Sequence, residues 1–463
     1  MTESFRLEND SMGSIEVPSS ALWGAQTQRS LRNFAIGKDK VPLKLIYSLV
    51  SIKRAAAKCN NRLGALSINK ADFIINACDE ITSGRHDSQF PLSVWQTGSG
   101  TQTNMNVNEV ISNIASLSNR NELGSHQPLH PNDDVNCSQS TNDVFPAAIQ
   151  IATIKEIIFN LLPEIDLLIK AFEKKIIEWK DIVKTGRTHL QDAVPLTLAQ
   201  EASAWKEQLV TARNRISHSL DELYPLPLGG TAIGTGLNAP SGFDEEIACE
   251  IASSTELPFK SALNKFAMMA SHDGLVHTMS ELKMLAISLL KIVNDLRLLS
   301  CGPRAGLGEI LLPENEPGSS IMPGKINPTQ CEAMAMVCTQ VIALEAAVAM
   351  AGSGGHLQMN AYKPLIGLNL LQSIDLLSSA CKCSRVAMIE GIQPNISRIQ
   401  TNLQQSLMLV TSLTPTIGYE KASKIAQYAH ANNISLKEAA KALDYVTEDV
   451  FDRIVDPKLM TNL

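Results

Sequence analysis

Five long segments of this chain carry the apolar spacing of α-helices, and they constrain its fold more than any other feature. Apolar side chains recur in them at intervals of three and four residues, which places these side chains on one face of a helix. Each segment is longer than the average helix of a globular protein, which has about eleven residues, and strand patterns are scarce. We therefore predict an all-α fold built around a central bundle of long helices. The segments are residues 147–183, 196–223, 262–299, 331–350 and 357–381.

Shorter helical patterns flank the predicted bundle, and Pro163 is expected to kink its first helix or to start a new one. Residues 391–395 contain the glycine and proline of a boundary. Long helices with apolar residues on more than one side need partners, which bundles shared between copies of the chain would supply. The three predicted domains are a mainly helical N-terminal domain (1–139), the central bundle (140–395) and a small helical C-terminal domain (396–463).

Composition and charge exclude several classes of partner. The chain has 40 basic and 47 acidic residues, a formal net charge of -7, so nothing in its overall charge favours nucleic acid. Its nine cysteines lack the spacing of a zinc or iron–sulfur site, which indicates reduced thiols in a cytoplasmic protein without a metal. The first ten residues lack the apolar core of a signal peptide, and charges interrupt the apolar runs, so we expect no membrane anchor.

A glycine- and serine-rich loop, residues 318–328, leads into the fourth long segment. Its two glycines permit backbone dihedrals that other residues resist, and Asn327 followed by Pro328 is typical of a helix cap and first turn. Lys325 adds a full positive charge to the partial positive charge of the helix start. The loop therefore suits a carboxylate or phosphate ligand, although an ordinary surface loop with a helix cap has a similar composition.

Further polar clusters stand at predicted helix starts or between long helices. Runs of small hydroxyl and amide residues occur at 95–109, 130–136 and 138–143, and residues 186–193 form a polar insert that contains a histidine. Each run is consistent with helix capping alone. The runs 130–136 and 138–143, however, are so close to each other that together they exceed what capping requires. A glycine-rich stretch at 228–236 matches neither a dinucleotide-binding fingerprint nor a P-loop, so we predict no nucleotide site there.

The loop also resembles the signature of the fumarase/aspartase superfamily. The resemblance rests on the run Gly318-Ser319-Ser320-Ile321-Met322-Pro323-Gly324-Lys325-Ile326-Asn327-Pro328, and the following Thr329-Gln330-Cys331-Glu332 is similar to class II fumarases in particular. Similarity at residues 11–13 and 22–30, and at intervals to 407–411, extends it over nearly the whole chain. It implies a homotetrameric enzyme that interconverts fumarate and L-malate without a metal or an organic cofactor.

The same resemblance assigns roles to individual residues. Ser319 would be the base that removes a proton next to a carboxylate, and His189 with Glu332 would form the second proton-transfer group. A serine hydroxyl is a weak base, so this role requires N–H groups or positive charge that lower its pKa. The implied substrate-binding residues are Ser99, Gly100, Thr101, Ser140, Thr141, Asn142, Thr188, Ser320, Lys325, Ile326 and Asn327, and an implied second dicarboxylate site comprises His130, Pro131, Asn132 and Asp133.

The sequence departs from the class II pattern at two of these sites. Thr141 stands where fumarases usually have serine, which is the more aspartase-like choice and adds a methyl group near the substrate. Gln127 stands where some fumarases carry a basic residue, close to the implied second site. Two other interpretations therefore stay open: an aspartate ammonia-lyase, and a helical scaffold of the same superfamily that has lost its activity.

Overall fold

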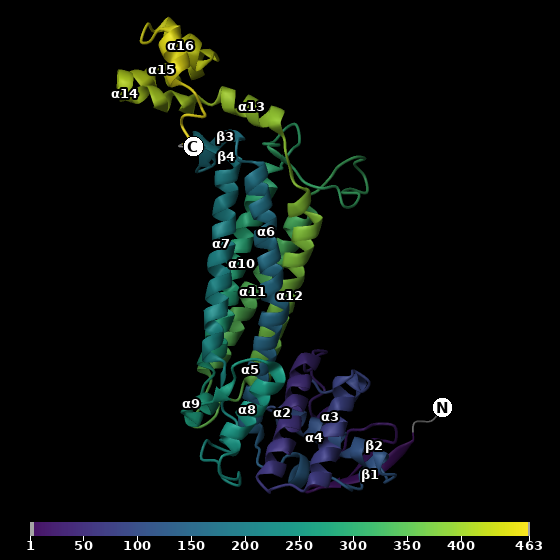
Figure 1. The fold of residues 1–463 in the computed structure, drawn as a ribbon. Coiled ribbons are helices and arrows are strands. Elements are labelled where there is room, and N and C mark those ends of the chain that lie inside the picture. Colours follow the sequence, from purple (N-terminus) through teal and green to yellow (C-terminus); the bar gives the residue numbers. More distant parts are fainter. Residues whose placement is uncertain (1–3, 462–463) are drawn as a thin grey trace. The chain divides into compact units, whose positions relative to one another are not determined.

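The computed structural model describes residues 4–461, and most of them lie in helices (Figure 1). The strands among these residues are short and pair two at a time, which confirms the predicted all-α class. The chain divides into two compact units, each made of three separate stretches. Unit 1 comprises Met1–Pro163, Asn214–Met284 and Gln340–Ser378, and unit 2 comprises Glu164–Arg213, Leu285–Thr339 and Ser379–Leu463. The predicted boundaries at 139 and 395 stay predictions.

Unit 1 contains the shorter helices and strands of the N-terminal part of the chain. They are β1 (Phe5–Asp10), β2 (Gly13–Pro18), α1 (Ala25–Asn33), α2 (Leu43–Arg62), α3 (Ile68–Thr82), the 3₁₀-helix Asp87–Gln89, α4 (Thr101–Ser118), the π-helix Pro131–Val135, the 3₁₀-helix Leu220–Glu222, β5 (Pro225–Leu226), α8 (Phe243–Thr255), β6 (Lys260–Ser261) and α9 (Lys265–Ala270). α2 contacts α3, α4, α8 and α5 (Thr141–Glu156). Its buried side chains, among them Leu45, Leu49 and Ile52, recur at helical spacing and form the core of the unit.

Unit 2 contains a hairpin, a second strand pair and the C-terminal helices. They are β3 (Val183–Thr188), β4 (Gln191–Thr197), β7 (Ile310–Leu311), the 3₁₀-helix Ile389–Gly391, β8 (Gln393–Pro394), α13 (Ile396–Gln405), the 3₁₀-helix Leu407–Leu413, α14 (Thr414–Ile417), α15 (Tyr419–Asn432), α16 (Leu436–Ala442) and α17 (Glu448–Ile454). The C-terminal helices share a core of their own, which includes Leu413, Ile425 and Phe451.

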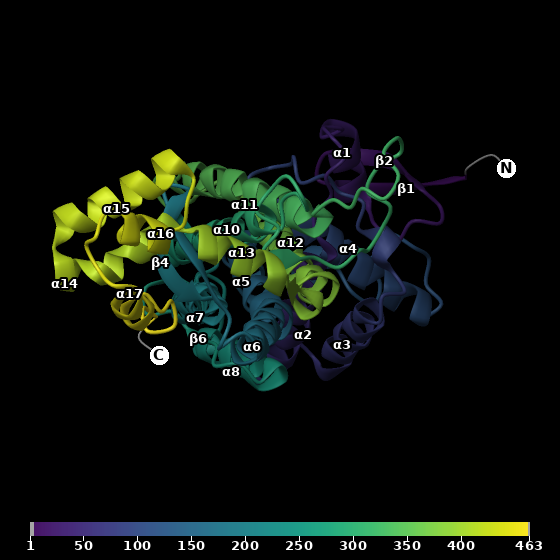
Figure 2. The same cartoon turned by 90° about the horizontal axis from the view of Figure 1, so that it is seen from above.

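Five long helical stretches are present, as the sequence predicts, and the division between the two units runs through all of them. They are Thr141–Glu178, which comprises α5, the π-helix Ile157–Leu161 and α6 (Leu162–Glu178), together with α7 (Leu198–Ser219), α10 (Asp273–Leu299), α11 (Thr329–Ser353) and α12 (Lys363–Ala387). Within unit 2, α6, α7 and α10 lie side by side (Figures 1 and 2). Trp205 of α7 donates to Asp295 of α10 at 2.9 Å, and Arg213 of α7 pairs with Asp166 of α6 at 3.0 Å.

Helix ends agree with the sequence analysis in one place and differ in two. α6 begins at Leu162, so Pro163 lies in a first turn, as expected for the start of a new segment. Residues 186–193, expected only as a polar insert, form the tip of the antiparallel hairpin β3–β4 and the strand residues next to it. Residues 357–362, expected to be helical, are not: His356 and Met359 form an isolated bridge, and α12 begins at Lys363, immediately before a proline that suits a first turn.

Two helical stretches are long and apolar enough to cross a membrane by length and composition alone, Thr141–Glu178 and Thr329–Ser353. The expectation that charges interrupt every apolar run therefore does not hold for them. In Thr141–Glu178, 72% of the most apolar window is buried, as in the core helix of a globular protein. In α11 the corresponding share is only 22%, so residues 4–461 leave most of this apolar helix uncovered.

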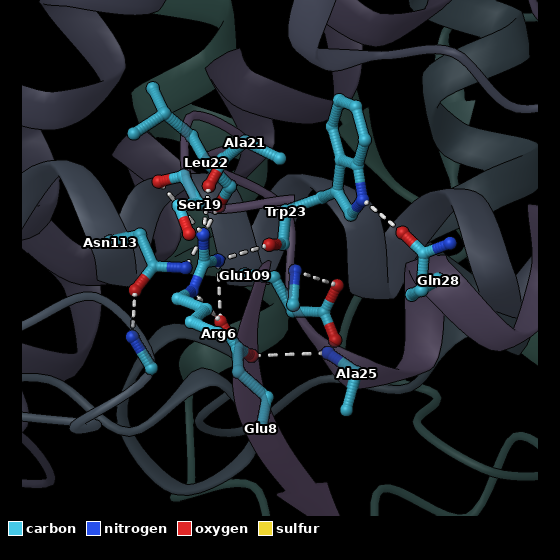
Figure 3. Close-up of polar contacts among 12 residues, drawn as sticks. Arg6, Glu8, Ser19, Ala21, Leu22, Trp23, Ala25, Gln28, Glu109 and Asn113 are labelled. Atoms are coloured by element: carbon cyan, nitrogen blue, oxygen red, sulfur yellow. Dashed lines mark hydrogen bonds and ion pairs between the residues drawn. The ribbon is translucent and has the colours of Figure 1, made fainter. Parts of the chain in front are cut away.

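Two buried carboxylates anchor the first turn of α1 (Figure 3). Glu109 of α4 accepts hydrogen bonds from the N–H groups of Gln26 (2.8 Å) and Thr27 (3.2 Å) and from the Thr27 hydroxyl (2.6 Å). Glu8 of β1 accepts from the N–H of Ala25 at 3.1 Å. A helix start has unpaired N–H groups and a partial positive charge, so both carboxylates stabilise it.

The two carboxylates differ in their charge partners. The Arg6 guanidinium donates to Glu8 at 2.8 Å and to backbone carbonyl groups of the turn 18–23, so Glu8 is neutralised (Figure 3). Glu109 has no basic partner among the described residues. Burial therefore raises its pKa to about 7, although hydrogen bonds from Thr27 and from backbone N–H groups act in the opposite direction.

This pKa predicts a pH dependence of stability. Since the pKa of Glu109 is higher in the folded protein than in the unfolded chain, ionisation should lower stability by about 3 kcal/mol as pH rises from about 4.5 to about 7, with no further loss above that. The variant Glu109→Gln lacks the titrating proton and should lose this slope. Urea unfolding midpoints between pH 5 and pH 8 measure it, with the exposed Glu16→Gln as the control. Parallel pH profiles for Glu109→Gln and the unsubstituted protein would contradict the assignment.

Candidate functional site

The first predicted carboxylate contact lies at the start of α4. Gly100 is the N-cap, with a φ of 83°, a conformation that favours glycine. A Cβ atom there would lie 2.5 Å from the ring of Phe145, so a larger residue would displace it. The flanking hydroxyl groups of Ser99 and Thr101 are 2.8 Å apart. Phe145 lies on α5 only four residues after Thr141. The close approach of Gly100 to the Phe145 ring therefore brings the starts of α4 and α5 together.

The second predicted contact lies at the start of α5. Ser140 is the N-cap, and its N–H donates to Asp143 at 3.0 Å while its hydroxyl accepts from the N–H of Asn142 at 3.2 Å, a capping box. Thr141 is nearly buried, with 7% of its surface exposed. The Asn142 amide donates to the carbonyl of Ala232 at 2.8 Å. Within unit 1, the structure thus brings Ser99–Thr101 and Ser140–Asn142 together.

Asp143 ties the glycine-rich stretch 228–236 to this helix start. Its other carboxylate oxygen accepts from the N–H groups of Gly229 (3.1 Å) and Thr231 (2.9 Å). Burial raises the pKa of Asp143 to about 7, although the hydrogen bonds from backbone N–H groups and the charge of Lys53 act against it. The glycine-rich stretch therefore packs as a wall beside the start of α5.

In unit 2, Thr188 and His189 lie at the tip of the hairpin β3–β4. Thr188 pairs with Gln191, and the two residues between them, His189 and Leu190, have φ values of 55° and 60°. Positive φ at both positions is typical of a two-residue hairpin turn whose twist matches that of the strands. The turn leaves both side chains exposed.

A buried ion-pair network holds the base of this hairpin. Glu309, which has no exposed surface, pairs with Arg187 at 2.7 Å and with Lys184 at 3.2 Å. Asn402 donates to the same carboxylate at 3.1 Å. Burial opposes ionisation of Glu309, but the hydrogen bond from Arg187 and the two positive charges outweigh it and lower its pKa. The network fixes β3 directly before Thr188.

The loop 318–328 of unit 2 closes on itself around Ser319. The Ser319 hydroxyl oxygen accepts hydrogen bonds from the N–H groups of Ile321 (3.3 Å) and Met322 (2.9 Å). Gly318 lies against the far side of the loop, where an added Cβ would be 2.2 Å from the Lys325 carbonyl oxygen. Two N–H donors aimed at one hydroxyl oxygen favour its deprotonated form, which is the condition that a serine base requires.

The structure corrects the prediction that Asn327 caps the following helix. α11 begins at Thr329, and the Asn327 amide donates to the carbonyl of Gly318 while its oxygen accepts from the Lys325 ammonium. These bonds link the two ends of the loop. The Asn327 side chain therefore does not bond to the first turn of the helix. Ser320 and Ile326 lie in the same loop, and among the described residues the Ser320 hydroxyl has no hydrogen bond.

The predicted proton-transfer pair is not in contact within the described chain. Glu332 lies in the first turn of α11 and His189 at the hairpin tip, and no hydrogen bond or ion pair among residues 4–461 joins either side chain to the other or to Ser319. Both side chains are exposed to solvent. Their roles stay predictions.

A cavity of about 600 Å³ borders the predicted second dicarboxylate site. Its lining includes His126, His130, Pro131, Asn132, Glu8, Asp10 and Glu109. Asp133 does not line the cavity, and 81% of its side chain is exposed. The histidines are the only basic residues among the described residues of the lining. Burial, with the neighbouring His130, lowers the pKa of His126. A dicarboxylate in this cavity would lie close to the carboxylates of Glu8, Asp10 and Glu109, which do not favour its binding. The second dicarboxylate site stays a prediction.

His130 caps the π-helix that carries this predicted site. Its Nδ1 accepts from the N–H groups of Asn132 (3.3 Å) and Asp133 (3.2 Å), and it also lies 3.3 Å from the Asp133 carboxylate. A ring nitrogen that accepts carries no proton, so it cannot also donate to the carboxylate. The directions of the backbone N–H groups are fixed, which makes the capping role the stronger assignment.

Sequence reasoning missed the buried charged residues behind the unit 1 site. Lys53, Glu109 and Asp143 were not among the predicted residues. Lys53 has a visible signal, because it stands four residues after Leu49 on the apolar face of α2, where a charge is unusual. Among residues 4–461, no group of three or more His, Cys, Asp or Glu side chains is arranged to hold a metal.

Comparison with known proteins places the chain in a family. A family model described as lyase matches residues 13–343, and one described as fumarase C C-terminus matches residues 409–462. A class II fumarate hydratase of Prochlorococcus marinus is 75% identical over 463 residues, which is 100% of this chain and 100% of the relative. A class II fumarate hydratase of Myxococcus xanthus is 52% identical over 460 residues, which is 99% of this chain and 99% of the relative. The crystal structure of recombinant class II fumarase from Schistosoma mansoni is 43% identical, with a TM-score of 0.97 and 99% of both chains covered. The chain therefore belongs to the class II fumarase family of lyases.

Proposed function

We propose that this protein is a fumarate hydratase, which adds water reversibly to fumarate to give L-malate. The observation that carries this function is the identity of 52% to 75% with class II fumarate hydratases over the full length of the chain. The geometry of the loop 318–328 supports it. The enzyme is a hydro-lyase, and its substrate is a small dicarboxylate.

The reaction sets two demands on the site. In the direction from malate, a proton must leave a carbon next to a carboxylate, and a hydroxide must leave the neighbouring carbon. The first step needs a base and fixed N–H or cationic groups that stabilise the growing charge on the carboxylate. The second step needs a general acid.

Ser319 is the proposed base. The N–H groups of Ile321 and Met322 already point at its hydroxyl oxygen, so they would stabilise the alkoxide at the moment it forms. The proton would pass from the carbon to this oxygen, leaving a carbanion stabilised by the adjacent carboxylate. Lys325, which is bonded to Asn327 in the same loop, supplies a positive charge close to that carboxylate.

The helix starts of unit 1 are the proposed second carboxylate contact. Ser99, Gly100 and Thr101 begin α4, and Ser140, Thr141 and Asn142 begin α5. Hydroxyl groups and the partial positive charge of a helix start suit a carboxylate. Thr188, Ser320, Lys325, Ile326 and Asn327 complete the proposed substrate contacts, and His189 with Glu332 is the proposed general acid.

We expect the protein to act in the cytoplasm as a homotetramer. All nine cysteines are free thiols, which agrees with a reducing compartment. α11 is apolar on all sides, yet only 22% of its most apolar window is buried, and its Met336 and Met350 are 68% and 76% exposed. A helix of this kind requires partners, and further copies of the same chain would supply them.

The first test separates hydration from ammonia addition. Fumarate absorbance should fall when the purified protein is added in the absence of ammonium, and the product should be L-malate. Because Thr141 is the aspartase-like choice at its position, the same assay is repeated with ammonium added. Fumarate loss that occurs only with ammonium present would replace the hydratase function with that of an ammonia-lyase.

The second test addresses the base. Ser319→Ala should lower kcat by about a hundredfold to ten-thousandfold, because it removes the proton acceptor, while circular dichroism should show an unchanged fold. Ser320→Ala is the matched control, since it changes a neighbouring hydroxyl of the same loop, and it should retain much more activity. Near-normal turnover by Ser319→Ala would exclude Ser319 as the base and make His189 the next candidate.

The third test addresses assembly. Light scattering should give a mass of about four times the 50.2 kDa of one chain. If the site draws Ser319 and His189 from different subunits, a mixture of Ser319→Ala and His189→Asn chains, refolded together, should recover activity that neither has alone. A fully active monomer would rule out both the tetramer and a shared site.

A further inference from the structure

A lysine without access to solvent lies beneath the turn that leads into α5. Lys53 of α2 is fully buried, and its ammonium donates to Oδ1 of Asn136 at 2.9 Å. We propose that Lys53 is a positioning residue for substrate binding, because through Asn136 it fixes the turn that presents Ser140, Thr141 and Asn142. This inference rests on the proposed role of those three residues as carboxylate ligands.

Asn136 joins three parts of unit 1 through one side chain. Its Oδ1 accepts from Lys53 of α2 and from the amides of Asn104 (3.1 Å) and Asn108 (3.2 Å) of α4. Its own amide donates to the carbonyl of Gln139 at 3.1 Å, next to Ser140. The first part of α4 and the turn before α5 are therefore held by the same side chain, that of Asn136, and Lys53 connects this side chain to α2.

A second residue of α2 holds the same turn. Asn60, seven residues after Lys53 and hence on the same face of the helix, donates to the carbonyl of Cys137 at 3.0 Å and accepts from the Ser138 hydroxyl at 2.6 Å. Ser138 has a φ of 61°, a conformation that a serine adopts only when its surroundings enforce it. The turn is thus shaped by α2 and does not follow from its own sequence.

The turn 136–140 is also connected to the glycine-rich stretch 228–236 beside the start of α5. Asp143, three residues after Ser140, binds the N–H groups of Gly229 and Thr231, and Asn142 binds the carbonyl of Ala232. The charge of Asp143 acts on Lys53. A displacement of the 136–140 turn would therefore move the helix start and the glycine-rich wall together.

Stability alone does not explain a lysine at this position. An amide oxygen has two lone pairs, and Asn104 and Asn108 satisfy both without Lys53. Burial lowers the pKa of Lys53 to about 7, against the favourable charge of Asp143, so the charged form is costly to keep in the folded protein. An apolar side chain of the same length would avoid this cost, but it would remove the link between Asn136 and α2 and leave only the bonds of Asn60 to hold the turn.

The variant Lys53→Met removes the hydrogen bond and the charge while keeping a similar volume. We expect KM for fumarate to rise about tenfold and kcat to change by less than about threefold, with a thermal unfolding midpoint that stays the same or rises. Succinate is a dicarboxylate that cannot react. Its dissociation constant, measured by calorimetry, should rise by the same factor as KM. A lower midpoint with unchanged KM and unchanged succinate binding would show a merely structural role and overturn the proposal.

A double-mutant cycle tests the route through Asn136. Asn136→Leu should also raise KM, and the double variant Lys53→Met/Asn136→Leu should be no worse than Asn136→Leu, because both changes break one connection. Additive effects would show that Lys53 acts on the substrate through its charge and not through the turn. Lys175→Met is the control, since Lys175 is another buried lysine, and within residues 4–461 its hydrogen bonds go to Glu178 and the Ile392 carbonyl, away from the 136–140 turn. An equal rise of KM in this control would overturn the proposal.

Two further outcomes are separable. If Lys53→Met does not fold, Lys53→Gln takes its place with the same expected KM and succinate results, because the glutamine amide is too short to reach Asn136. If the unsubstituted protein neither hydrates fumarate nor binds succinate, the proposed function is wrong and the role of Lys53 falls with it. Normal activity of the unsubstituted protein with unchanged KM in both Lys53 variants would overturn the positioning role alone.

Discussion

The carboxylate of Asp143 is the interaction on which the unit 1 site depends. It is fully buried, yet it accepts three backbone N–H groups, those of Ser140, Gly229 and Thr231. Removing it would leave these donors unpaired in a region closed to water, which costs far more than one hydrogen bond contributes. Glu109 has the same relation to the start of α1. In both places, a carboxylate from one helix fixes the backbone of another segment.

In unit 2, backbone N–H groups and not charged side chains surround the proposed base. Lys325 is bonded to Asn327, and among the described residues neither side chain has a hydrogen bond to the Ser319 hydroxyl. The proposed base and the proposed carboxylate contacts are thus bonded to different groups of one loop. The division explains why a loop of so few residues needs two glycines, since its backbone must turn back on itself to present both functions.

The sequence predicted what depends on local periodicity and missed what depends on distant partners. The spacing of apolar residues located all five long helices, and the polar clusters correctly marked the starts of α4 and α5. The hairpin β3–β4 was missed, because strand pairing depends on a partner and not on one run of residues. The cap at Asn327 was wrong because its side chain found Gly318 and Lys325 instead. Lys53 is visible as a charge on an apolar face, but its partner Asn136 lies 83 residues away.

The turn at His189 and Leu190 limits which residues can serve at the tip of this hairpin. A left-handed backbone tolerates glycine, asparagine, aspartate and histidine, and it strongly disfavours β-branched residues. Of these four, only histidine and aspartate can transfer a proton, and only histidine titrates near neutral pH. The backbone at position 189 therefore favours histidine among the residues that suit its proposed role, although Leu190 shows that other side chains also adopt this conformation at the tip of the hairpin.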